Sequence, residues 1–193
     1  IDPKYTLGDI AQSRDEVIRR LVADGLLDAN KRRQLSPIPL RVGVVTSVGT
    51  AAWHDFRDEL DRSGFGFQLR VCDTRVQGEW AVSTVAAAVR TLGRRGDVDC
   101  VVVIRGGGAR NELATFDAEP IAIAIATCTV PVLTGLGHEV DRSVADEVAH
   151  TALKTPTACA GHLVDAVHEY VATVEERWAA VAGGPPGAGP ATS

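Results

Sequence analysis

Two apolar stretches without polar alternation, residues 42–45 and 101–104, predict strands buried on both faces of a parallel sheet, at residues 41–46 and 101–104. Residues 67–72 alternate between apolar and polar side chains, which is typical of a strand nearer the edge of a sheet. Residues 130–134 form a short fourth strand. Its Pro131 indicates either an edge position or a place near the start of the strand.

Residues with helical spacing separate these strands. Trp53, Phe56 and Leu60 lie on one face of a helix that follows the first strand. Residues 79–92 are rich in alanine and valine and predict a second helix. Asp117 is expected to cap a third helix, which carries three isoleucines.

Capping residues predict further helices toward both ends of the chain. Ser13 begins a capping box, and the helix it opens is expected to end at Gly25. Ser143 caps a short helix, and Thr155 caps a long one that runs to about residue 182. The alternation of strands and helices predicts an α/β fold. We expect a doubly wound, open parallel sheet of about four strands, with helices on both faces and flanking helices at the two ends.

The domain organisation follows from this pattern. Residues 1–35 are expected to form a helical lead-in, residues 36–155 an α/β domain with the candidate chemistry, and residues 156–182 a C-terminal helix. Residues 183–193 contain mostly glycine, proline and other small residues and are expected to be disordered. The 193-residue chain starts at Ile1 and contains no methionine, which indicates a piece of a longer protein.

Charge and cysteine spacing narrow the class of protein. The net charge of -5 gives no global field that attracts nucleic acid, so a polyanionic substrate needs a local basic patch. The four cysteines lie far apart without a CxxC pair, which favours buried, reduced thiols in a cytosolic protein. No apolar run is long enough to span a membrane and no signal peptide is evident, so a cytoplasmic location is expected.

Polar residues gather where three predicted strands end. Thr46 and Ser47 follow the first strand, Arg105 and three glycines follow the strand at 101–104, and the segment 135–141 follows the fourth. Asp55, in the first helix, can face the same crevice. Doubly wound sheets bind ligands beyond the carboxyl ends of their strands, so these residues are the candidate site.

Three segments in this order resemble the catalytic domain of the exonuclease VII large subunit, over roughly residues 36–165. The segments that carry the resemblance are GVVTS at 43–47 with AAWHD at 51–55, VQGE at 76–79 leading to RGGG at 105–108, and GHEVD at 137–141 with AD at 145–146 and TPTA at 155–158. The resemblance implies hydrolysis of single-stranded DNA from its ends, in DNA catabolism and repair. It also implies an N-terminal OB-fold and a long C-terminal coiled coil that recruits small subunits, and we expect neither in this chain.

The resemblance places the catalytic residues at Asp55, Arg105, His138 and Asp141. Arg105 and the amides of Gly106, Gly107 and Gly108 are expected to stabilise charge on the phosphate, and Thr46 and Ser47 at a helix N-terminus offer a second anion site. His138 is the candidate general acid or base, with Asp141 or Asp55 orienting it or the attacking water. Arg75, Arg110 and Thr155 are further candidate phosphate contacts. A strictly required cofactor is not expected; the alternative is Mg²⁺ held by Asp55 and Asp141.

Two other functions stay open. The loops after Ser47 and after Gly108 differ from the usual pattern of the family, which favours a module that binds a nucleotide or phosphate without hydrolysing it. Alternatively, the domain serves assembly as a homo-oligomer through the helix at 157–182. That helix has an apolar stripe, formed by Val164, Val167, Val171 and Val174.

Overall fold

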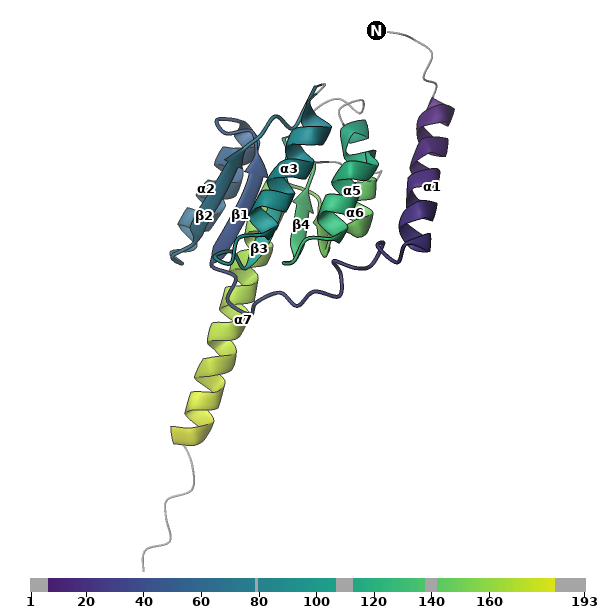
Figure 1. The fold of residues 1–193 in the computed structure, drawn as a ribbon. Coiled ribbons are helices and arrows are strands. Elements are labelled where there is room, and N and C mark those ends of the chain that lie inside the picture. The colour runs from purple at the N-terminus through teal and green to yellow at the C-terminus, as the bar shows by residue number, and fades with distance from the viewer. Residues whose placement is uncertain (1–6, 79, 107–112, 138–141, 183–193) are drawn as a thin grey trace, which may run out of the picture.

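The computed structural model describes residues 7–78, 80–106, 113–137 and 142–182, with side chains from residue 13 onward. Its centre is a five-stranded parallel sheet in the order β2-β1-β3-β4-β5 (Figure 1). The strands, in chain order, are β1 (Arg41–Thr46), β2 (Gln68–Asp73), β3 (Cys100–Ile104), β4 (Val132–Gly135) and β5 (Thr151–Leu153).

Helices cover both faces of the sheet, as the sequence predicts (Figure 1). One face packs against α2 (Ala51–Arg62) and the first half of α7 (Pro156–Ala182). The other face packs against α3 (Ala81–Gly93), α5 (Glu119–Ala126) and α6 (Val144–Val148). The helix α1 (Leu7–Ala23) lies beside α6 and the short 3-10 helix η1 (Ala114–Asp117).

Alternate residues of the central strands enter two separate cores. Val102 and Ile104 of β3 pack toward α2 and α7, whereas Val101 and Val103 pack toward α3 and α5. All five residues of β3 are buried, which confirms the interpretation of the unalternated apolar run. The first turn of α7 lies directly on β4, because a Cβ at Gly135 would meet Cys159 Sγ at 2.6 Å and Thr155 O at 2.9 Å.

The sheet has one strand more than the sequence predicts. The missed strand, β5, has only three residues, all half-buried, and its sequence Thr-Ala-Leu lacks a strand-like apolar run. It forms because it pairs with β4, from Leu133 opposite Thr151 to Gly135 opposite Leu153. As a result β4 is an interior strand, so the edge alternative is wrong. The other alternative is confirmed: Pro131 directly precedes the strand, so its missing N–H costs no ladder hydrogen bond. The edge position of β2 is confirmed.

Two predicted caps are wrong and two are confirmed. Ser13 lies inside α1, which already begins at Leu7. Ala118, and not Asp117, is the N-cap of α5; the Asp117 carboxylate instead accepts a hydrogen bond from the N–H of Val144 at 2.9 Å. Ser143 forms a capping box with Asp146, and Thr155 Oγ1 accepts a hydrogen bond from the N–H of Ala158.

The apolar stripe of α7 divides into two parts. Val167 is buried and Val164 is half-buried against the domain, whereas Val171 and Val174 are 39% and 45% exposed. The second half of the helix projects away from the sheet (Figure 1). No helix in the described ranges is both long and apolar enough to cross a membrane.

Candidate functional site

A cavity of about 450 Å³ lies beyond the carboxyl ends of β1 and β3, and we call it the arginine cavity. In the strand order β2-β1-β3-β4-β5, the chain connections reverse direction between β1 and β3, and doubly wound sheets bind ligands at that point. Ten residues from three segments line the cavity: Thr46, Ser47, Thr50, Ala51, Ala52, Arg75, Val76, Gln77, Arg105 and Gly106.

Arg105 is a charged residue that the fold buries almost completely. It directly follows β3, only 1% of its surface is exposed, and its backbone N–H donates a hydrogen bond to Gly135 O at 3.1 Å. A guanidinium keeps its charge even when buried, and its planar fork of donors matches a phosphate. The fold therefore holds a fixed positive charge on the wall of the cavity.

The turn between β1 and α2 forms the second wall. Thr50 is the N-cap of α2: its hydroxyl accepts a hydrogen bond from the N–H of Trp53 and donates one to Ser47 O at 2.7 Å. The N–H of Val48 donates to Asp73 Oδ1 at 2.9 Å, which fixes the turn to the end of β2. The first turn of α2 has no acidic residue, and its Ala51 and Ala52 line the cavity, so the positive end of the helix dipole faces it.

Thr46 contributes a buried hydroxyl to the cavity. The residue is fully buried at the end of β1, and its Oγ1 has no hydrogen-bond partner among the described residues. Buried polar groups are nearly always hydrogen-bonded, so this hydroxyl suits a ligand oxygen.

Arg75 and Gln77 form the exposed rim. The loop that carries Arg75 is tied to α3, because Thr84 Oγ1 lies 3.1 Å from Arg75 O. The described part of the lining thus has two arginines and no carboxylate, which gives a local positive patch in a chain whose net charge is -5. An anion of phosphate size fits this charge and these donors.

The predicted site residues fall into three groups. The structure brings Thr46, Ser47, Arg75, Arg105 and Gly106 together in the cavity. Asp55 is exposed on α2, one turn beyond Ala51, and Thr155 is an exposed cap of α7; neither lines the cavity. The remaining candidates lie outside the described residues: Gly107, Gly108, Arg110, His138 and Asp141.

Sequence reasoning missed Thr50 and Gln77 in the lining and Asp73 as the residue that fixes the turn. Asp73 pairs with Thr46 in the parallel register of β1 and β2. The sequence could have predicted this position of Asp73, because residues that end neighbouring parallel strands lie at the same edge of a sheet.

The cysteines take no part in the cavity. Cys100, Cys128 and Cys159 are buried and Cys72 is half-buried, and all four are free cysteines. Burial raises the pKa of the Cys100 and Cys159 thiols far above the usual range, so both stay protonated and poorly nucleophilic. Within the part of the chain that the structure describes, no three His, Cys, Asp or Glu residues form a metal-binding group.

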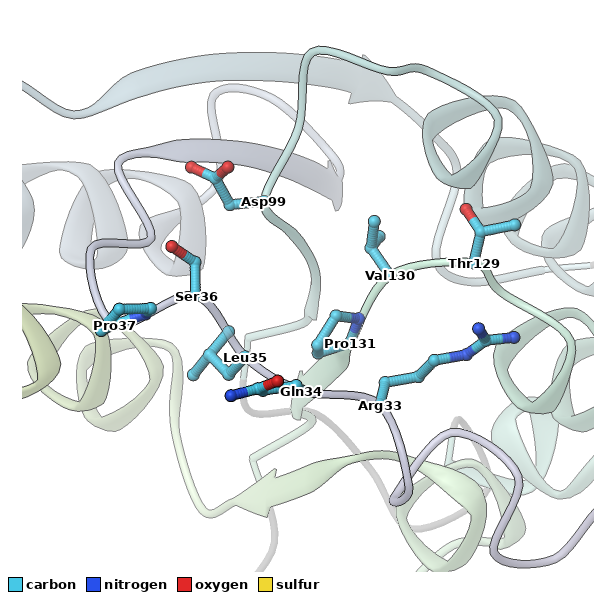
Figure 2. A pocket seen from close by; sticks show the side chains of 9 residues that line it. All are labelled: Arg33, Gln34, Leu35, Ser36, Pro37, Asp99, Thr129, Val130 and Pro131. Carbon is cyan, nitrogen blue, oxygen red and sulfur yellow. The ribbon is translucent and has the colours of Figure 1, made fainter.

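A second cavity, of about 520 Å³, lies at the opposite edge of the sheet, and we call it the amino-edge cavity (Figure 2). Its lining runs from Arg33 to Pro37 and adds Asp99 and the segment from Thr129 to Pro131. Arg33 and Asp99 stand on opposite sides, with Pro131 between them (Figure 2). The Asp99 carboxylate is held by Arg41, whose N–H and guanidinium donate to it at 2.8 Å and 2.5 Å.

Comparison with known proteins decides the family. The family model of the exonuclease VII large subunit matches residues 26–182. The chain belongs to this family. The exonuclease VII match contains the whole sheet and every lining residue of the arginine cavity.

Relatives in the family are similar over most of the chain. The exodeoxyribonuclease 7 large subunit of Moorella thermoacetica is 41% identical over 145 residues, which is 75% of this chain and 36% of the relative. That of Nostoc sp. is 38% identical over 78% of this chain and 36% of the relative. That of Geotalea daltonii is 34% identical over 91% of this chain and 39% of the relative. The chain therefore spans somewhat more than a third of the length of these relatives.

Proposed function

We propose that this chain is the catalytic core of an exonuclease VII large subunit, which hydrolyses phosphodiester bonds in single-stranded DNA from the ends. The observation that carries the proposal is the arginine cavity, whose described lining combines two arginines, a helix N-terminus and a buried hydroxyl, with no carboxylate among these described residues. Family membership supports the same reaction, since the relatives are named exodeoxyribonucleases.

The phosphate of the scissile bond lies in the arginine cavity. Arg105 and the amide of Gly106 neutralise the charge that builds on the phosphate oxygens, and Thr46 and Ser47 donate from the β1 side. Arg75 at the rim contacts the same or the adjacent phosphate. Gly107, Gly108, Arg110 and Thr155 are proposed as further contacts along the strand.

Proton transfer is assigned to His138 and the carboxylates. Gly135, at the end of β4, pairs with Ile104, and the sequence reaches His138 three residues later. A general base takes a proton from the attacking water and a general acid protonates the leaving oxygen; His138 serves one of these steps. Asp141 and Asp55 orient the imidazole or the water. In the Mg²⁺ alternative these two carboxylates hold the ion instead.

The whole protein is proposed to work with partners. The family name implies a small subunit, which we assign to a coiled coil not contained in this chain, and we expect a cytoplasmic role in DNA catabolism and repair. Assembly of several copies of the large subunit is a further expectation.

The test is degradation of an end-labelled single-stranded oligonucleotide by the whole large subunit with its small subunit. We expect His138→Ala to lower the rate by about 10²- to 10⁴-fold, because it removes a proton-transfer group. Cleavage that survives EDTA supports the metal-independent route, whereas cleavage that EDTA abolishes and Mg²⁺ restores supports the ion at Asp55 and Asp141. An unchanged rate for His138→Ala contradicts the assignment. A wild type that binds the strand without cutting it would instead support the phosphate-binding module.

A further inference from the structure

A smaller cavity of about 330 Å³ adjoins the arginine cavity. Its lining consists of Asp73, Thr74, Arg75, Trp80 and Thr84. Arg75 belongs to both linings, so the two cavities meet at this residue.

Trp80 is the aromatic residue of the smaller cavity and is 62% exposed. Its backbone is well anchored, because its carbonyl oxygen lies 2.8 Å from Thr84 Oγ1 and 3.0 Å from Ser83 Oγ. The same Thr84 hydroxyl lies 3.1 Å from Arg75 O. One side chain of α3 therefore holds both the aromatic residue and the arginine that the two cavities share.

The chemistry of the smaller cavity differs from that of its neighbour. It contains the Asp73 carboxylate, which repels a phosphate and accepts hydrogen bonds from amino groups. It also contains the indole of Trp80, which offers a large flat face for stacking. A carboxylate beside an aromatic face suits a nucleobase, whereas the arginines next to it suit a phosphate.

We propose that Trp80 stacks on a nucleobase of single-stranded DNA whose neighbouring phosphate lies in the arginine cavity. The proposal rests on the proposed function. It assigns to this chain a base subsite that tolerates any sequence, since every base has a π-face. It also gives a reason for preferring single strands, because a base within a duplex is already stacked and cannot reach an exposed indole.

The experiment is fluorescence anisotropy with the 193-residue chain and two short labelled strands. One strand is oligothymidylate, and the other has the same phosphates but abasic sugars. The wild type is expected to bind the base-bearing strand about tenfold more tightly, which is typical of a single stacked base. Trp80→Ala should abolish this preference and Trp80→Phe should keep most of it. Trp178→Ala is the matched control, because Trp178 is 74% exposed on the projecting half of α7.

Arg105→Met separates the two proposals. It should weaken binding of both strands to the same extent, because both carry the phosphates. If Trp80→Ala keeps the wild-type preference, or if the wild type does not distinguish the strands, the stacking subsite is overturned while the Arg105 effect still supports the phosphate site. If the wild type binds neither strand, both the subsite and the proposed function are overturned.

Discussion

The two cavities at opposite edges of the sheet differ in charge more than in size. The amino-edge cavity is the larger, at about 520 Å³ against about 450 Å³. Its described lining has one arginine and one aspartate, and the carboxylate of that aspartate, Asp99, is bound by Arg41. Among the residues that the structure describes, the lining of the arginine cavity has two cations and no acid. The net charge of the described lining residues, rather than the volume, thus distinguishes the candidate site.

The same contrast appears in the buried polar groups. At the amino edge, Asn30 is fully buried and all its side-chain atoms are used: Nδ2 donates to Val130 O at 3.0 Å and to Cys128 O at 3.4 Å, and Oδ1 accepts from the N–H of Val132 at 2.8 Å. These bonds fasten the segment before β1 to the start of β4. At the carboxyl edge, Thr46 Oγ1 has no partner among the described residues. The amino edge therefore serves stability, and the carboxyl edge keeps donors for a ligand.

The largest expected effect is the loss of activity when Arg105 is neutralised, and the matched comparison is Arg33 at the other edge. Arg105→Met should lower the rate of single-strand degradation by about 10²- to 10³-fold, because it removes a preorganised cation from the developing phosphate charge. Arg33→Met, at the amino edge, should leave the rate unchanged. Initial rates with an end-labelled strand measure both, and thermal unfolding checks that the variants are folded. Equal losses for the two variants would mean that the edges do not differ in function.

A second substitution tests the structural character of the amino edge. Asn30→Leu has nearly the same volume but leaves Val130 O and the N–H of Val132 buried without their partner. We expect a loss of about 3 kcal/mol in the free energy of unfolding and a fall of roughly 5–10 °C in Tm. The amide control is Gln34→Leu, at an exposed residue of the same edge, which should change stability by less than about 0.5 kcal/mol. A Tm that Asn30→Leu leaves unchanged would contradict this view.

The sequence predicts the central strands and much of the lining of the arginine cavity, and both predictions have the same physical basis. Uninterrupted apolar runs mark buried parallel strands, and parallel strands deliver the residues after them to one edge, so Arg105, Gly106, Thr46 and Ser47 were predicted together. The strand β5 cannot be predicted from the sequence, because its three half-buried residues show no apolar periodicity. Only their pairing with β4 makes them a strand. The burial of Asn30 likewise cannot be predicted from the residues around it, because it depends on contacts with the distant segment that contains Val130.

The positions of exposed helix residues were equally hard to predict. Asp55 follows Ala51 and Ala52 by about one turn, yet those two alanines line the cavity and Asp55 does not. The sequence places an acid near the start of α2, but only the packing of α2 against Gly106 shows which turn faces the ligand; a Cβ at Gly106 would lie 3.6 Å from Ala52 Cβ. The role of Asp55 in catalysis stays a prediction.

The smallest effects compare two buried threonines near the carboxyl ends of β1 and β4, the two strands that flank β3. Thr134 Oγ1 donates to Asp146 Oδ1 at 2.6 Å, whereas Thr46 Oγ1 has no partner in the described protein. Thr134→Val should therefore cost about 1–3 kcal/mol of stability, because it removes a buried hydrogen bond to a carboxylate. Thr46→Val should hardly change Tm but should weaken binding of a single strand by about tenfold, the usual size for one hydrogen bond to a charged group. Thermal unfolding measures the stability of both variants, and fluorescence anisotropy measures their affinity for a single strand. If Thr46→Val loses stability and keeps its affinity, then its hydroxyl serves the fold and not the ligand, and the carboxyl edge resembles the amino edge after all.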